Sequence, residues 1–126
     1  MIYCFDGDTA GRTAAWRALE NSLASLYDGR KIKFLFLPSE HDPDSYIRAA
    51  GKYDFEQKLE ESISITDYLF LHQEQLLGTD GLMTVEGRVN FVKLCKPLIN
   101  KVPEGAYRII LETELAKRCQ LTQDKI

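Results

Sequence analysis

Two closely spaced pairs of aspartates are the residues of this chain best suited to metal chemistry. Asp6 and Asp8 flank a glycine directly after an apolar run, and Asp42 and Asp44 flank Pro43. Carboxylate oxygens are hard donors, which suit Mg²⁺ or Mn²⁺ better than they suit a soft metal. Each pair is therefore a candidate ligand set for a divalent cation that in turn binds phosphate.

Each pair follows a segment with the composition of a β-strand. Residues 2–5 are β-branched, aromatic or small, as in a buried strand, and residues 31–37 become continuously apolar. A helix predicted over residues 9–27, ended by Asp28-Gly29, joins them into one parallel βαβ unit. Neighbouring parallel strands end at the same sheet edge, where α/β proteins bind ligands. All four aspartates are expected there, and their mutual repulsion favours bound cations.

The same aspartates also have a purely structural interpretation. Asp-Gly and Asp-Pro are common in turns, and aspartate is a favoured N-cap of helices. Taken alone, Asp42-Pro43-Asp44 is more typical of a helix start, whereas Asp6-Gly7-Asp8 fits a turn and a metal motif about equally well. The recurrence of a pair after both strands favours the metal site. Arg12 is placed equally well to contact a phosphate or a carboxylate.

The second half of the chain has the pattern of a helical bundle. Short helices are expected after Pro43 and over residues 52–62. Longer helices are expected over 64–77, from Thr84 with a kink or interruption at Pro97, and from about Pro103 to Cys119. We predict a domain over residues 1–62 that holds the βαβ unit and a helical bundle over residues 63–126. The fold class is thus an α/β piece followed by an α piece.

Composition and charge narrow the class of protein. The 126 residues are 44% hydrophobic and 28% charged, as in globular proteins. No apolar run approaches the ~20 residues that span a bilayer. A net charge of −3 provides no general attraction to nucleic acid. Three widely spaced cysteines without a CxxC pair indicate free thiols in a reducing compartment, so we expect a cytoplasmic protein without a zinc site.

A longer pattern surrounds the aspartates. It runs over residues 6–20, through 36–38 and 42–45, and then to Gly51-Lys52 and Phe55-Glu56. In the helical half it continues with Gly87-Arg88, Pro97-Leu98-Ile99, Val102-Pro103 and Tyr107-Arg108-Ile109. This joint pattern resembles the bacterial replicative DNA primases of the DnaG type. Its Asp-x-Asp motif alone is shared with topoisomerases and related nucleases, because all of these carry the Toprim fold.

The resemblance implies a fold, an activity and a set of site residues. The chain would be the carboxy-terminal part of the Toprim RNA polymerase domain followed by a helical subdomain. The family makes short RNA primers on single-stranded DNA from ribonucleoside triphosphates at the replication fork, by nucleotidyl transfer with Mg²⁺ or Mn²⁺, and so forms an RNA–DNA hybrid. By resemblance Asp6 and Asp8 are catalytic, and Asp6, Asp8, Asp42 and Asp44 bind the metals.

The chain also departs from the family pattern. The family's metal-binding glutamate lies on an earlier strand and has no counterpart here, and neither has its zinc-binding domain, its basic template-binding subdomain or its helicase-docking domain. We therefore expect the chain alone to make no primers and to bind metal weakly. We also expect the parent enzyme to contact the replicative helicase through a domain that this chain lacks.

Two other functions stand as alternatives. The chain could be a helical interaction module of a replication protein, with the βαβ unit as a non-catalytic support. A phosphatase or receiver-type domain would instead use Asp6 as nucleophile or phosphoacceptor. Those folds need a lysine and a serine or threonine at later strand ends, and no later strand is predicted, so this alternative is the weaker one.

Overall fold

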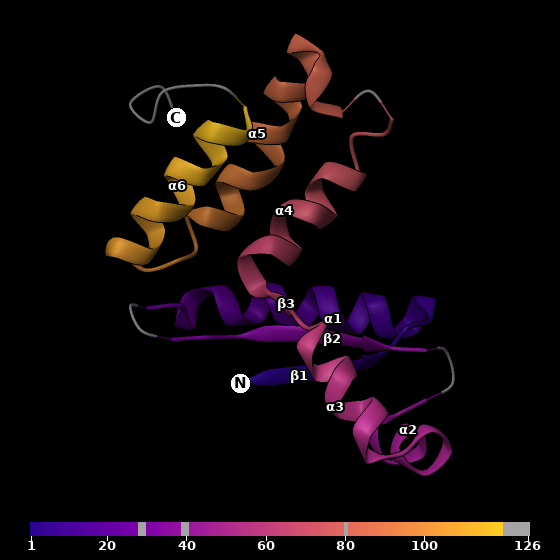
Figure 1. Ribbon diagram of the computed structural model, residues 1–126. Coiled ribbons are helices and arrows are strands. Elements are labelled where there is room, and N and C mark those ends of the chain that lie inside the picture. Colours follow the sequence, from indigo (N-terminus) through magenta and orange to yellow (C-terminus); the bar gives the residue numbers. More distant parts are fainter. Residues whose placement is uncertain (28–29, 39–40, 80, 120–126) are drawn as a thin grey trace. The chain divides into compact units, whose positions relative to one another are not determined.

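The chain folds into two compact units. The computed structural model describes residues 1–27, 30–38, 41–79 and 81–119 (Figure 1). One unit comprises Met1–Asn21 and Lys31–Ile65, and the other comprises Ser22–Arg30 and Thr66–Ile126. The sequence had placed its boundary after residue 62 and had assigned residues 22–30 to the first part. Among the described helices, none has the length and apolar character needed to cross a membrane.

A small three-stranded sheet organises the first unit. Strand β1 (Ile2–Asp6) pairs in parallel with β2 (Lys33–Leu37), and Asp6 lies opposite Leu37. Strand β3 (Ile63–Ser64) pairs antiparallel with the other side of β2. The parallel pairing is confirmed, whereas the expectation of only two strands is wrong. A strand of two residues is too short to show any periodicity in the sequence.

The central strand β2 is the most deeply buried part of this sheet. Its Phe34, Leu35 and Leu37 are buried, whereas β1 is only half-buried. The prediction that both strands are buried is therefore wrong for β1, because β1 lies at the edge of the sheet. Tyr3 and Phe5 of β1 lie beside the ring of Phe34, with centroids 5.6 and 6.0 Å away. These aromatic contacts hold β1 in register with β2.

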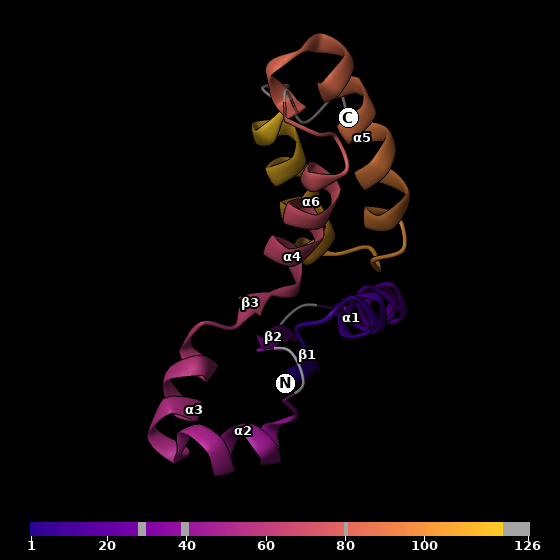
Figure 2. The same ribbon diagram turned by 90° about the vertical axis from the view of Figure 1, so that its right-hand side faces the viewer.

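Three helices accompany the sheet in the first unit. Helix α1 (Thr9–Ser22) lies on one side of the strands, and α2 (Pro43–Ala50) and α3 (Lys52–Glu60) lie on the other (Figure 2). Helix α1 is shorter than predicted and passes into the 3-10 turn η1 (Leu23–Ser25). The Ser25 hydroxyl donates to the Ser22 carbonyl at 2.9 Å, a local bond that competes with helix continuation. The predicted terminator Asp28-Gly29 lies outside the described residues.

The second unit is helical, as the sequence predicts. It contains α4 (Ile65–Gln75, of which Ile65 belongs to the first unit), the 3-10 turn η2 (Gly81–Met83), α5 (Val85–Ile99) and α6 (Ala106–Arg118). The rings of Phe70 on α4 and Phe91 on α5 lie 6.2 Å apart and are fully buried. Leu111 and Leu115 supply the buried face of α6. Apolar side chains at helical spacing thus form the core that the pattern indicated.

Pro97 does not interrupt α5, contrary to one of the two expected outcomes. The helix runs through it to Ile99. The proline cannot donate a backbone hydrogen bond to the preceding turn. In that turn the side-chain amide of Gln73 on α4 donates to the Leu94 carbonyl at 2.9 Å, and Gln73 is itself buried. A side chain from the neighbouring helix therefore anchors the turn that precedes the proline, at the carbonyl next to the Lys93 carbonyl that Pro97 leaves without its helical donor.

The cysteines are free thiols, as predicted. Cys4 is half-buried, and Cys95 and Cys119 are buried. Burial, with a smaller contribution from Cys119, raises the pKa of Cys95 to about 12. Burial likewise raises the pKa of the Cys119 and Cys4 thiols. All three thiols are therefore protonated, and weakly nucleophilic, at neutral pH.

At Gly11 the first turn of α1 lies close to the end of β1, and a substitution there tests how close the two backbones are. A Cβ at Gly11 would overlap the carbonyl oxygen of Asp6. An ordinary helical Gly→Ala change stabilises by about 1 kcal/mol, but here the clash reverses the sign. We predict that Gly11→Ala lowers the free energy of unfolding by about 1–3 kcal/mol, measured by urea denaturation.

The control for this prediction is Ala14→Gly on the exposed side of the same helix. It reports the ordinary propensity difference and should cost about 1 kcal/mol. A stabilising Gly11→Ala variant would show that the junction has room for a methyl group.

Candidate metal centre

The first acidic pair lies where β1 passes into α1. Asp6 is the last residue of β1, and Asp8 immediately precedes the helix. Asp8 Oδ1 accepts a hydrogen bond from the Gly11 backbone N–H at 2.7 Å. Asp8 is therefore a side-chain cap of α1. In the described part of the chain, the carboxylate of Asp6 has no hydrogen-bond or ion-pair partner.

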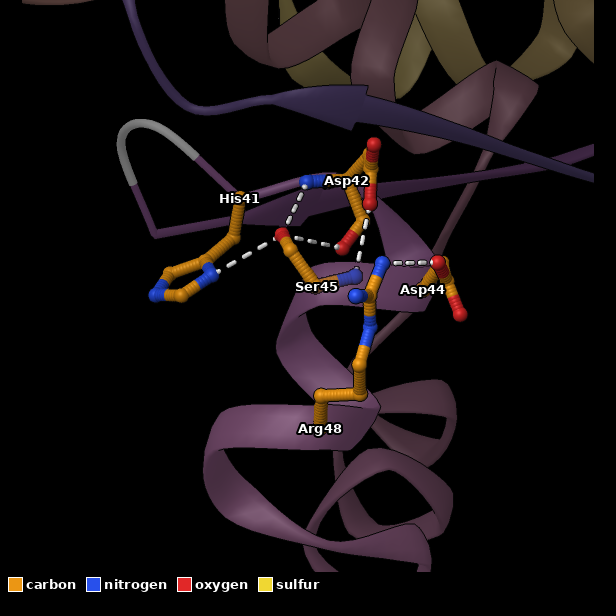
Figure 3. Close-up of polar contacts among 5 residues, drawn as sticks. All are labelled: His41, Asp42, Asp44, Ser45 and Arg48. Carbon is orange, nitrogen blue, oxygen red and sulfur yellow. Dashed lines mark hydrogen bonds and ion pairs between the residues drawn. The ribbon is translucent and has the colours of Figure 1, made fainter.

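The second acidic pair begins α2 (Figure 3). Asp42 Oδ1 accepts from the Ser45 backbone N–H at 2.7 Å, and the Asp42 N–H donates to the Ser45 hydroxyl at 3.0 Å. This reciprocal capping box confirms the helix-start interpretation of Asp42-Pro43-Asp44. The Ser45 backbone N–H is the main reason that the pKa of Asp42 is lowered, with smaller help from the Ser45 hydroxyl and Arg48. The cap thus favours the charged carboxylate.

Neighbouring side chains surround the second pair with further polar contacts. Asp44 forms an ion pair with Arg48 one turn on, and both side chains are about three-quarters exposed, at 76% and 75%. Such an exposed pair adds little stability. His41 Nδ1 lies 3.1 Å from the Ser45 hydroxyl, and its ring meets Tyr46 edge-on. His41 therefore extends the capping network (Figure 3).

Arg12 forms no ion pair with a carboxylate among the described residues, and its contact with a phosphate stays a prediction. Its guanidinium lies over the ring of Phe36 on β2, 4.8 Å from the centroid. A cation held over an aromatic face keeps its charge near the carboxyl end of β2. Arg12 is thus a fixed positive charge beside the acidic strand ends.

The strand pairing places the carboxyl ends of β1 and β2 side by side, and the second acidic pair lies further along the chain at the start of α2. Asp6 is paired with Leu37, and Asp42 follows Leu37 by five residues. Among the described residues, however, no group of three or more His, Cys, Asp or Glu side chains is arranged to hold a metal ion. The carboxylate donors fit Mg²⁺ or Mn²⁺ in kind, and Mg²⁺ often takes only one or two protein carboxylates with several waters. The donor set fits a partial, water-rich site, and metal binding stays a prediction.

The sequence analysis did not predict that Gly11, Ser45 and Arg48 contact the aspartates. The signal for Ser45 was present, because a hydroxyl three residues after an N-cap aspartate is the spacing of a capping box. The ion pair of Asp44 with Arg48 follows from their i,i+4 spacing on a helix. The role of Gly11 was not visible, since it depends on how closely the helix approaches β1.

Solved structures similar to this chain include catalytic domains of DnaG-type primases. A DNA primase domain from Pseudomonas aeruginosa matches 98% of the chain at 36% identity with a TM-score of 0.90, and the chain covers 38% of it. A DnaG primase catalytic domain bound to single-stranded DNA matches 99% of the chain at 38% identity with a TM-score of 0.88, and the chain covers 39% of it.

Curated relatives give the same assignment. DNA primase from Haemophilus influenzae is 45% identical over 118 residues, which is 94% of this chain and 19% of that protein. The chain thus spans about a fifth of the length of the curated relatives that it matches. Over nearly its whole length the chain is thus similar to a segment of these bacterial DNA primases.

A family model matches most of the helical part of the chain. The model describes the DnaB-helicase binding domain of primase and matches residues 74–124. The sequence had led us to expect the helicase-docking domain outside this chain. The matched range includes α5 and α6, and helicase binding by these helices stays a prediction.

The capping box leads to a testable prediction about the pKa of Asp42. Its pKa is lowered in the folded state, so its contribution to stability is fully present above the unfolded pKa of about 4 and is lost as pH falls through the folded pKa. Ser45→Ala removes the hydroxyl but keeps the backbone N–H. We predict a partial rise of the Asp42 pKa, measured by carboxyl-carbon NMR titration.

The matched control is Ser25→Ala, which removes a hydroxyl bonded only to the Ser22 carbonyl in the described structure. It should leave the pKa of Asp42 unchanged. An Asp42 pKa at its ordinary value in the unsubstituted chain would contradict the capping geometry.

Proposed function

We propose that this chain carries two acidic strand ends of the catalytic centre of a bacterial DNA primase. In the parent enzyme, residues 1–62 would form part of a Toprim unit of a DNA-directed RNA polymerase that makes short RNA primers. The observation that supports this most directly is the parallel pairing of β1 with β2, which ends β1 at Asp6 beside Leu37, five residues before Asp42. The high similarity to primase catalytic domains over nearly the whole chain agrees with it.

The substrates follow from the same proposal. The parent enzyme would bind a single-stranded DNA template and ribonucleoside triphosphates, and would hold the RNA–DNA hybrid that it forms. A solved relative is bound to single-stranded DNA, which supports the template. The place of action would be the replication fork in the cytoplasm.

The metal would be held by Asp6 and Asp8, with Asp42 and Asp44. When bound, Mg²⁺ neutralises phosphate charge and polarises the reacting oxygens. The chain's own contribution is to fix the carboxylates. The Gly11 N–H orients Asp8, the Ser45 N–H orients Asp42 and keeps it charged, and the end of β1 sets the position of Asp6.

Asparagine at position 8 separates the structural role of Asp8 from the proposed metal role. Asparagine is as good an N-cap as aspartate, so Asp8→Asn retains the hydrogen bond to Gly11 but removes the charge. We predict that Asp8→Asn in the full-length parent enzyme lowers template-dependent primer synthesis by about a hundredfold or more. The measurement is RNA formed on a single-stranded template, with thermal unfolding as the check on folding.

Asp54→Asn on α3 is the matched control, because it removes a carboxylate from the first turn of another helix. It should leave primer synthesis unchanged. Full activity of Asp8→Asn would mean that the residue is only a cap, and the metal proposal for this position would then fall.

The chain on its own should lack activity, because it covers only about a fifth of its relatives and forms no group of three metal ligands among its described residues. We predict no template-dependent RNA from the purified chain, and weak Mg²⁺ binding by titration calorimetry. Primer synthesis by the isolated chain, or tight Mg²⁺ binding, would show that its four aspartates suffice.

A second candidate function is that of a helical interaction module. It is favoured by the match of residues 74–124 to the DnaB-helicase binding domain of primase. On this view the second unit binds the replicative helicase, and the βαβ unit need not be catalytic. The two functions are compatible in one parent enzyme, since they involve different units of the chain.

A further inference from the structure

The side chain of Arg12 is exposed and forms no ion pair in the described part of the chain. Three other arginines each pair with a carboxylate one turn away on the same helix, namely Arg48, Arg108 and Arg118. Arg12 also has a carboxylate at this spacing, because Asp8 lies four residues before it. The missing ion pair therefore has a local cause.

Both members of the possible pair are held by other contacts. Asp8 Oδ1 accepts from the Gly11 backbone N–H at 2.7 Å, which keeps this carboxylate at the start of α1. The Arg12 guanidinium lies over the ring of Phe36, 4.8 Å from its centroid. Phe36 is the next-to-last residue of β2 and pairs in register with Phe5, the next-to-last residue of β1. The local structure thus keeps cation and carboxylate apart, and neither charge neutralises the other.

The contact with Phe36 leaves the polar edge of the guanidinium unused. The face of an aromatic ring attracts a cation without accepting a conventional hydrogen bond from it. In the described part of the chain, the Arg12 guanidinium donates no hydrogen bond. A planar guanidinium carries its N–H donors as a rigid fork, which matches the oxygens of a phosphate group. Arg12 therefore presents a free phosphate-binding fork near the end of β2.

The surroundings of Arg12 favour a compact phosphate ligand over a nucleic-acid backbone. Proteins bind backbone phosphates with several basic residues spread along a surface. The other basic residue of α1 is Arg17, five positions further on and about 140° around the helix axis. The two arginines therefore form no basic stripe on α1. A triphosphate instead concentrates its negative charge within reach of a single fork.

We propose that Arg12 binds the phosphate chain of the ribonucleoside triphosphate beside the aspartates of the candidate centre. This inference rests on the proposed function above and adds a substrate-binding residue to it. Phe36 would hold the guanidinium in position before the substrate arrives, which lowers the entropic cost of binding. Asp8 would not compete with the phosphate for Arg12, since its carboxylate is turned to the Gly11 N–H.

The test measures binding of a fluorescent ribonucleoside triphosphate to the full-length parent enzyme by anisotropy, with Mg²⁺ and without template, so that no turnover occurs. Arg12→Gln removes the charge and the fork, and we expect about tenfold or more weaker binding. Arg12→Lys keeps the charge but loses the fork, and should bind with intermediate affinity. The matched control Arg17→Gln, at an exposed position of the same helix, should bind as the unsubstituted enzyme does.

Primer synthesis supplies a second readout. Arg12→Gln should raise the KM for the triphosphate about as much as it weakens binding, and should change kcat less. A residue that only packs against Phe36 would not produce this separation of KM from kcat. Circular dichroism checks that the variants fold. If Arg12→Gln does not fold, Arg12→Lys supplies the same comparison, because it retains an alkyl stem to pack over Phe36.

Three outcomes would overturn the proposal. Unchanged triphosphate binding by Arg12→Gln would show that the side chain only packs on Phe36. Weaker binding of single-stranded DNA with unchanged triphosphate binding would assign Arg12 to the nucleic-acid backbone. An equal loss in Arg17→Gln would indicate a general effect of charge. In all three cases primer synthesis by the unsubstituted enzyme would still stand, whereas its absence would reject the proposed function itself.

Discussion

The parallel pairing of β1 with β2 is the constraint on which the candidate centre depends. Because Asp6 lies opposite Leu37, the two strands end side by side, and the segment that leads to Asp42 starts beside Asp6. A slip of one residue would turn every β1 side chain to the other face. The aromatic contacts of Tyr3 and Phe5 with Phe34 oppose such a slip. The register of a half-buried edge strand therefore decides where the proposed chemistry takes place.

The capping and metal interpretations of the aspartates do not exclude each other. Asp8 and Asp42 each use one carboxylate oxygen to cap a helix. An N-cap is held at a defined position beside the positive end of a helix, so the bond that begins the helix also orients a charged oxygen. The same hydrogen bond therefore has two effects. It stabilises the start of the helix, and it orients a carboxylate that could bind a cation.

Sequence reasoning was reliable where a pattern is local and periodic. It found the parallel βαβ unit from the order of its elements, and the helix starts at Asp42 and Thr84 from the residues next to them in the chain. It missed β3, because a strand of two residues shows no periodicity. It also predicted a buried β1, because the burial of a strand depends on its position in the sheet and β1 lies at the edge. The four aspartates could be named from their spacing and the family resemblance, but their distances from one another depend on loops that spacing does not describe.

The protonated thiols give the two units separate chemical reporters. Cys4 lies in the first unit, and Cys95 and Cys119 lie in the second. A buried thiol such as Cys95 or Cys119 reacts with alkylating reagents mainly when its surroundings open and expose it to water, whereas the half-buried Cys4 is partly accessible in the folded unit. The alkylation rates of Cys95 and Cys119 therefore report the local opening of the second unit, and the rate of Cys4 reports the accessibility of β1 in the first, without any added label. Ligands that stabilise one unit should slow the alkylation of its own cysteines.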